Sequence, residues 1–597
     1  MSFKNLLTDF NLNKRDAIYI LILLAYSILI VSAKIIFQPD HLIHSDVLVF
    51  LGNTLRFAGL TDNTFNSPYM YLSPVYCFLA SILFRLGLVH PISMYIVGGI
   101  FFILGNVGLY ILYKCRFNEL LSLLGVIIFS TFTAVITFLA YGTVDMPAIA
   151  VSIWILVFLV LAVNKNPKYY IHCSVLLLIG IFTKYTVLFM IPLIVLYFFS
   201  KHNFFNAFDL LLTDRNEFKK AMIGFLKSDE FKYIAIACIL AVLIFAAFSL
   251  VISAHGSQLT FLTQTKDASS NFAASKYSVD RGYHTSPSFY INDFNKILYF
   301  HDKSFTASHF LMLSEIVLIL GLIIQSANIV KNRDALGKLK SRDFSTKHLK
   351  SILTVLIFVL FIFTIFYATK NHLIANTAFL TGIVIIYSLL DNRGINRRVY
   401  STSLLMVAWF VVYFVFFCAI TIKSPRYPLT VVPAFVYFIL WAAESIIYFL
   451  ENRFDSNDSF AKRYADFKVF EFDKKSSMMK IVKIMIVIAM ILLIYHALTT
   501  DLDSLQNRTN EDVDDLAVTY DYIMKTDDDY KNKTYLSDVE YHSRYGTWYM
   551  KTPIKLTRDF NATQLDNIDY IMTNSSYGFG DYELIFSSGK VHLYQHL

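Results

Sequence analysis

Runs of about 18 or more predominantly apolar residues recur along most of this 597-residue chain. A helix of that length crosses the roughly 30 Å hydrocarbon core of a bilayer. Hydrophobic residues make up 56% of the chain, well above the usual share for a soluble globule. The pattern predicts an all-α polytopic membrane protein with about thirteen transmembrane helices. We expect these helices near 16–37, 92–113, 119–140, 146–163, 171–183, 186–199, 231–253, 308–330, 350–369, 372–390, 400–421, 430–449 and 480–497.

Two stretches allow a second interpretation. Residues 70–88 are apolar enough to form a further span, and residues 171–199 can be one long helix or two short ones broken around Thr183-Lys184. Either change alone moves Asp145 to the other side of the membrane. Both changes together leave everything after residue 200 where it was.

The positions of the basic loops predict how the chain is oriented in the membrane. Lysines and arginines gather near 200–230, 331–350, 391–399 and 451–480, which all fall on one side of the predicted spans. The positive-inside rule makes that side cytoplasmic. The net charge of +8 therefore reflects membrane topology and not a nucleic-acid partner. We expect a multi-pass protein of the cell (plasma) membrane, surrounded by membrane lipids.

The opposite side receives a first external loop over 38–91, a long loop over 254–308, short turns at Lys370 and 423–429, and the polar tail. The tail has strand-like runs such as Tyr570-Ile-Met-Thr. We therefore divide the chain into a transmembrane domain, 1–498, and a small C-terminal extracytoplasmic α/β domain, 499–597.

Ionisable residues at membrane depth or at span ends are candidates for function, because burying them is costly. Asp46, Asp145, Lys184 and Arg426 stand out, with His44 two residues before Asp46. Each has a simpler interpretation. An aspartate at a span end can cap its helix, a lysine can reach the headgroups, and an arginine can anchor at the interface. His41 and His44 are better explained as surface residues than as metal ligands.

These residues and the motifs around them occur in an order that is found in a known family. An Asp follows the first span, then come Tyr71-Leu-Ser-Pro-Val-Tyr76, Val144-Asp-Met-Pro147, Gly180-x-x-Thr-Lys184 and a late Arg426-Tyr-Pro. In that order the chain resembles the GT-C membrane glycosyltransferases, in the branch of the protein O-mannosyltransferases and aminoarabinose transferases. These enzymes take a sugar from a polyprenyl phosphate.

The resemblance implies a fold of roughly 11–13 spans with helices of the first external loop lying on the membrane. It implies a catalytic aspartate in that loop, matched by Asp46, and a second acidic position in the next external loop, matched by Asp145. It also favours residues 70–88 as a surface helix, so that both carboxylates and Lys184 face the same side. Two positions depart from the family: Val47 stands where many members have Glu, and Ser73-Pro74 replaces Pro-Pro or Lys-Pro.

The expected chemistry follows from these parts. Asp46 would act as general base on an acceptor hydroxyl. Lys184 and Arg426 would bind the donor phosphate, and Asp145 would position the acceptor or a cationic partner. Transfer in one step inverts the anomeric centre. The donor or acceptor would also meet the aromatic first loop and the 254–308 loop, at Tyr71, Tyr76, Arg281, Tyr283 and His284.

No nucleotide-phosphate loop or metal-ligand cluster is present in the sequence, so the expected ligand is a polyprenyl-phosphate-sugar, with a divalent metal left open. The acceptor can be a glycan, a lipid or a protein. One alternative is a transporter or flippase of lipid-linked glycans, although the repeated halves typical of transporters are not found. Another is an oligosaccharyltransferase-like GT-C enzyme, which should carry a Trp-Trp-Asp type motif. The nearest string here, Gly546-Thr-Trp-Tyr, does not match.

Overall fold

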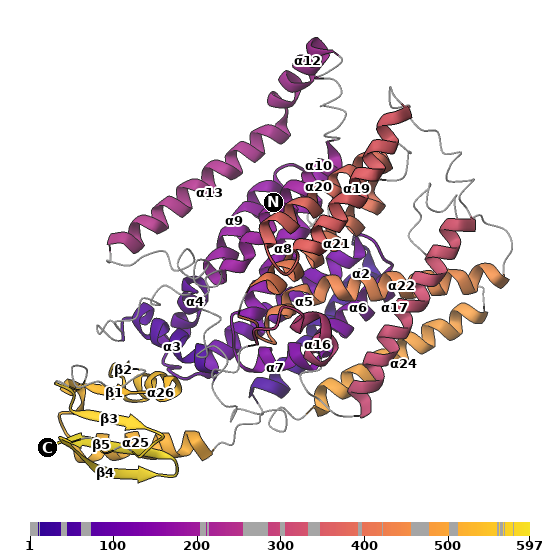
Figure 1. Ribbon diagram of the computed structural model, residues 1–597. Coiled ribbons are helices and arrows are strands. Elements are labelled where there is room, and N and C mark those ends of the chain that lie inside the picture. Colours follow the sequence, from indigo (N-terminus) through magenta and orange to yellow (C-terminus); the bar gives the residue numbers. More distant parts are fainter. Residues whose placement is uncertain are drawn as a thin grey trace.

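A computed structural model describes most of the chain. The described residues are 10, 12–36, 44–60, 73–202, 211, 214–254, 284–298, 305–331, 347–391, 397–420, 422–454, 477–500, 511–557, 560, 565, 567–576, 578 and 580–597. They form a large helical body and a small sheet domain (Figure 1). The predicted fold class is confirmed.

Every predicted span coincides with a helix or a pair of consecutive helices. Eight described segments are long and apolar enough to cross a membrane, and α6 with α7 forms a pair bent by 60°. Other apolar helices are shorter, so the number of spans stays a prediction. The helices of the body are α2 (Lys14–Val31), α5 (Ile92–Lys114), α6 (Glu119–Thr131), α7 (Thr133–Ala140), α8 (Asp145–Asn164), α9 (Tyr169–Thr183), η2 (Tyr185–Phe189), α10 (Met190–Lys201), α13 (Asp229–Ala254), α17 (Phe305–Lys331), α19 (Lys347–Tyr367), α20 (His372–Asp391), α21 (Arg397–Ala419), η4 (Tyr427–Val431), α22 (Val432–Phe454) and α24 (Ser477–Thr499).

Five further elements lie between these helices. They are the π-helical turn η1 (Ser32–Ile36), α3 (Ser45–Ala58), α4 (Pro74–Arg85), α12 (Arg215–Leu226) and α16 (Phe289–Leu298). Helix α4 has 12 residues, which span only about 18 Å at 1.5 Å per residue. This is shorter than the hydrocarbon core, as a surface helix would be, and whether residues 70–88 span the membrane stays a prediction. Helices α3 and α4 pack on each other beside the body.

Helices α9 and α10 form a hairpin with Lys184 at its tip. The amide of Asn164, at the end of α8, donates to the Tyr197 hydroxyl on α10 at 3.0 Å. At the other end of α8, Lys184 contacts Asp145. Since α8 begins at one contact and ends at the other, α9 and α10 run in opposite directions. Residues 171–199 are therefore two helices and not one.

The same contacts divide the body into two ends. The end that holds Asp46 also holds Lys184, the 284–298 segment and the turn before η4. The other end holds Asn164, Lys201 and the buried pair of Arg116 with Glu444. The described parts of the loops predicted to be external thus gather together at one end, apart from the described basic loops.

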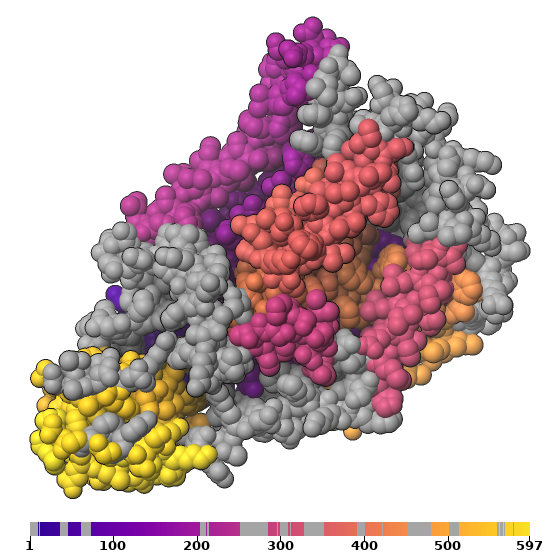
Figure 2. Space-filling model, viewed as in Figure 1, coloured from indigo at the N-terminus to yellow at the C-terminus, as the bar shows by residue number. Residues whose placement is uncertain are grey.

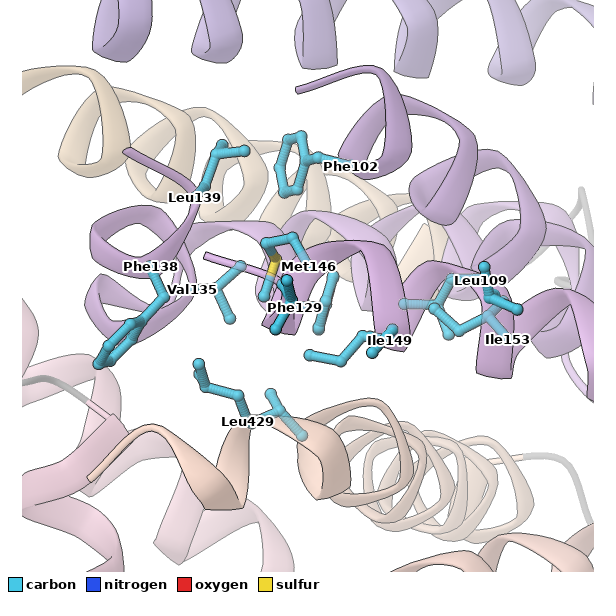
Figure 3. Packing of buried hydrophobic residues seen from close by; sticks show 14 of the residues in the cluster. Phe102, Leu109, Phe129, Val135, Phe138, Leu139, Met146, Ile149, Ile153 and Leu429 are labelled. Atoms are coloured by element: carbon cyan, nitrogen blue, oxygen red, sulfur yellow. The ribbon is translucent and has the colours of Figure 1, made fainter. Parts of the chain in front are cut away.

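Buried apolar side chains join α5, α6, α7 and α8 to η4. Figure 3 shows Met146 and Ile149 of α8 close to Val135 of α7, with Leu429 of η4 facing them from the other side. Met146 directly follows Asp145, and Leu429 lies three residues after Arg426. This packing therefore fixes two of the candidate residues relative to each other.

The C-terminal domain is a five-stranded sheet with two helices. Its elements are α25 (Glu511–Thr526), η6 (Tyr530–Asn532), β1 (Tyr535–Ser537), α26 (Glu540–Met550), β2 (Ile554–Leu556), β3 (Tyr570–Thr573), β4 (Tyr582–Ser588) and β5 (Val591–His596). The strand order is β2-β1-β3-β5-β4, with β1 parallel to both β2 and β3, and β5 antiparallel to β3 and β4. In Figure 2 the domain forms a lobe at one end of the helical body. The predicted α/β tail is confirmed, while its boundary at residue 499 is not tested.

Candidate functional site

Asp46 is the second residue of α3, and local sequence places it there. His44 caps this helix, because its ring Nδ1 accepts from the Asp46 backbone N–H at 3.2 Å. The helix ends at Gly59, whose φ of 72° suits glycine. Val47 and Leu51 are fully buried and fix the face of α3 on which Asp46 lies. A glutamate in place of Val47 would therefore occupy a buried position.

Two arginines hold the two carboxylate oxygens of Asp46. Arg426 Nη1 lies 2.5 Å from Oδ2, and Arg544 Nη1 lies 3.4 Å from Oδ1. Burial acts to raise the pKa of Asp46, but the charges of Arg426, His44 and Arg544 outweigh it. The pKa lies well below its usual value, so Asp46 is ionised and can accept a proton only when a partner moves away.

Asp145 and Lys184 form a second ion pair. Asp145 begins α8 and is 2% exposed, and its Oδ1 lies 2.5 Å from Lys184 Nζ. The other oxygen, Oδ2, has no hydrogen-bond partner among the described residues. Val144, and not Asp145, occupies the N-cap of α8. Neither simpler interpretation describes these residues: Asp145 does not cap its helix, and Lys184 turns inward to a carboxylate.

Gly142 makes this position of Asp145 possible. Its φ is +62°, and a Cβ atom built there would lie 2.2 Å from the ring of Tyr95. Only glycine fits the turn from α7 to α8. The Tyr76 hydroxyl lies 2.7 Å from the carbonyl oxygens of both Met94 and Gly142, so α4 is bound to the same turn.

The two candidate phosphate ligands both lie near one aromatic ring. Lys184 Nζ is 5.9 Å, and Arg426 Cζ 5.8 Å, from the centroid of Tyr427. Arg426 also interacts electrostatically with Asp145. Two cations and two carboxylates from four separate segments therefore meet at one end of the body, which sequence order alone does not require.

The structure does not show the other residues predicted to contact donor or acceptor beside these charges. Tyr76 is fully buried, and its hydroxyl binds backbone rather than an open surface. His284 pairs with Lys423 through two backbone hydrogen bonds of 2.9 Å. Tyr71, Arg281 and Tyr283 lie outside the described residues. The role of each in binding donor or acceptor stays a prediction.

Sequence reasoning did not identify Arg544 and Tyr290 in these roles. Arg544 lies in the C-terminal domain, 498 residues from Asp46. Tyr290 lies within the 254–308 loop, and its hydroxyl donates to the Ser424 carbonyl at 2.9 Å and accepts from the Ser424 N–H at 3.0 Å. No motif marks either residue. Over the part of the chain that the structure describes, no group of three or more His, Cys, Asp or Glu residues is placed to hold a metal ion.

Residues 68–208 match the family described as dolichyl-phosphate-mannose-protein mannosyltransferase. The match contains Tyr76, Asp145 and Lys184 but neither Asp46 nor Arg426. It confirms the resemblance noted in the sequence, the membrane glycosyltransferase class and, with the apolar helices, a multi-pass membrane protein. A search of curated proteins finds no match.

Solved structures resemble the chain along most of its length at low identity. ArnT from Cupriavidus metallidurans bound to undecaprenyl phosphate has 10% identity and a TM-score of 0.49, over 96% of this chain and 97% of ArnT. The Archaeoglobus fulgidus oligosaccharyltransferase tethered with an acceptor peptide has 13% identity and a TM-score of 0.46, over 93% and 69%. These likenesses do not bear on the residues of the site.

Proposed function

We propose that this protein transfers a sugar from a polyprenyl-phosphate donor to an acceptor hydroxyl on the extracytoplasmic side of the membrane. The observation that carries the proposal is the meeting of Asp46, Arg426, Asp145 and Lys184 at one end of the body. The family matched by residues 68–208 is described by a dolichyl-phosphate-mannose donor, which supports a lipid-linked substrate. The positive-inside rule supports the side.

Lys184 and Arg426 supply positive charge for the phosphate. Both charged groups lie within 6 Å of the centroid of the Tyr427 ring, which supports a shared anion site beside that ring. Arg426 offers a planar guanidinium that suits two phosphate oxygens, and Lys184 adds a point charge. Charge grows on the phosphate as the glycosidic bond breaks, so these cations stabilise the transition state more than the ground state.

Asp46 is the proposed base. The acceptor oxygen attacks the anomeric carbon, Asp46 takes the hydroxyl proton, and the bond from the anomeric carbon to the phosphate oxygen breaks. Polyprenyl phosphate leaves with the bonding electron pair, and the anomeric centre is inverted. A donor phosphate on Arg426 would weaken the hold of that arginine on Asp46 and so raise the basicity of the carboxylate. Asp145 holds Lys184 in place.

The test is sugar transfer by purified protein in lipid nanodiscs, from labelled polyprenyl-phosphate-sugars to a panel of hydroxyl acceptors. We expect transfer by the wild type and a loss of about 10²–10⁴-fold in Asp46→Asn. Binding of undecaprenyl phosphate should be retained in this variant, because Asn no longer competes for Arg426. Full activity of Asp46→Asn would remove Asp46 as the base.

Two rival functions give different results in the same experiment. A flippase would bind the lipid donor without transferring its sugar and would move it between the leaflets of vesicles. An oligosaccharyltransferase-like enzyme would modify asparagine in a sequon peptide and leave hydroxyl acceptors unchanged. Either result would replace the proposed reaction.

A further inference from the structure

The C-terminal domain reaches the candidate active site through α26. This helix packs on α3, the helix that begins beside Asp46. The ring of Trp548 on α26 lies 6.0 Å, between centroids, from the ring of Phe84 on α4. The domain therefore lies against both helices of the first external loop, as Figure 1 shows at the lower left. Its position is set by packing as well as by charge.

Arg544 projects from this interface to Asp46. Its Nη1 lies 3.4 Å from Asp46 Oδ1, and its Nη2 pairs with Glu540 one turn earlier on α26. Arg426 holds the other oxygen, Oδ2. The side chains of Asp46, Arg426 and Arg544 are 27%, 17% and 25% exposed, so all three are partly shielded from water. The carboxylate is thus shared between an arginine of the transmembrane domain and one of the C-terminal domain.

We propose that Arg544 is a positioning residue that takes over Asp46 when a donor phosphate engages Arg426. This inference rests on the proposed function. A phosphate and a carboxylate compete for the guanidinium of Arg426, and the carboxylate binds it less readily if another cation already holds it. Arg544 therefore favours release of Arg426 to the donor.

Arg544 also fixes the orientation of the Asp46 carboxylate. A carboxylate that loses its only partner can rotate, whereas one still held at Oδ1 keeps Oδ2 free and directed at the acceptor. Misplacement of a base by about 1 Å can cost on the order of 10²-fold in rate. The C-terminal domain is in this view a component of the catalytic unit and not only a platform for acceptors.

Binding of undecaprenyl phosphate to the full-length protein in nanodiscs tests the first effect. We expect Arg544→Gln to weaken binding about tenfold, because Asp46 then stays with Arg426. Arg544→Lys keeps the charge and should restore most of the affinity. The matched control is Lys525→Gln, which breaks an exposed ion pair with Asp521 in the same domain and should bind as the wild type does.

A double-mutant cycle separates this role from general effects of charge or folding. In an Asp46→Asn background, Arg544→Gln should change the affinity less than about twofold, because no carboxylate remains to be held. An equal loss in both backgrounds would overturn the proposal, as would wild-type affinity in Arg544→Gln. Thermal unfolding of each variant verifies that the protein is folded.

Turnover provides an independent readout. With saturating donor, Arg544→Gln should lower kcat about tenfold or more, while Lys525→Gln leaves it unchanged. An unchanged kcat would contradict the orienting role. A wild type that neither binds undecaprenyl phosphate nor transfers sugar would overturn the proposed function itself. An active wild type whose binding and turnover are unchanged by Arg544→Gln would overturn this inference alone.

Discussion

Lys184 Nζ lies 2.5 Å from Asp145 Oδ1, joining the tip of the α9–α10 hairpin to the first residue of α8. Both side chains are largely buried, at 11% and 2% exposure. The pair determines where Lys184 can present its charge.

We therefore expect Lys184→Gln to destabilise the protein by about 3–5 kcal/mol, since it leaves Asp145 buried without its cation. The double variant Lys184→Gln/Asp145→Asn should regain much of this loss because no charge remains unpaired. Thermal unfolding in the same detergent measures both. Equal stability of the single and double variants would show that an unpaired Asp145 charge is not the cause of the lost stability.

The pH dependence of stability should reveal the lowered pKa of Asp46. A carboxylate whose pKa is lower in the folded state stabilises the protein above the unfolded pKa, about 3.9, and loses this effect as pH falls through the folded value. The difference in unfolding free energy between wild type and Asp46→Asn should thus be constant from about pH 8 to 5 and shrink only below about pH 4. A difference that fades between pH 7 and 5 would contradict a lowered pKa. Unfolding followed across this pH range provides the measurement.

Tyr76→Phe should lower stability by about 1–2 kcal/mol, because the buried hydroxyl lies within hydrogen-bond distance of two backbone carbonyls. Affinity for undecaprenyl phosphate should stay unchanged, since the side chain is fully buried. Thermal unfolding and lipid-phosphate binding measure the two effects. A loss of affinity at full stability would instead support Tyr76 as a donor contact.

Tyr290→Phe should weaken binding of undecaprenyl phosphate on the order of fivefold. The Tyr290 hydroxyl holds both the N–H and the carbonyl of Ser424, two residues before Arg426, so its loss lets the arginine move. Tyr495→Phe is the control, because that tyrosine is 65% exposed on α24. Wild-type affinity in Tyr290→Phe would show that the turn is held by other contacts.

The ion pair of Arg116 and Glu444, at the opposite end of the body, should affect stability without affecting chemistry. Its two hydrogen bonds are 2.9 and 2.7 Å long. Arg116→Met should cost about 3–5 kcal/mol, and Arg116→Met/Glu444→Leu much less. Sugar transfer per folded molecule should equal that of the wild type in both. A fall in kcat at equal folded fraction would show coupling across the membrane.

The sequence by itself determined the helical class and the position of nearly every apolar helix. Apolar runs require helices in a membrane, because the backbone of each run must satisfy its own hydrogen bonds there. The strand-like runs of the tail likewise predicted the small sheet domain. Asp46, Asp145, Lys184 and Arg426 were found because ionisable residues beside apolar runs are costly and few.

Only the tertiary structure decided which of these charges meet. Hydropathy does not distinguish a hairpin over 171–199 from one long helix. The contacts of Lys184 with Asp145 and of Tyr197 with Asn164, at opposite ends of α8, settle that choice. Pairing across the chain depends on packing such as that of Leu429 against Met146 and Ile149, which no local pattern encodes. Arg544 illustrates the limit most clearly. A lone arginine on a helix of a polar domain has no distinguishing neighbour in sequence, and it becomes part of the site only because α26 packs on α3.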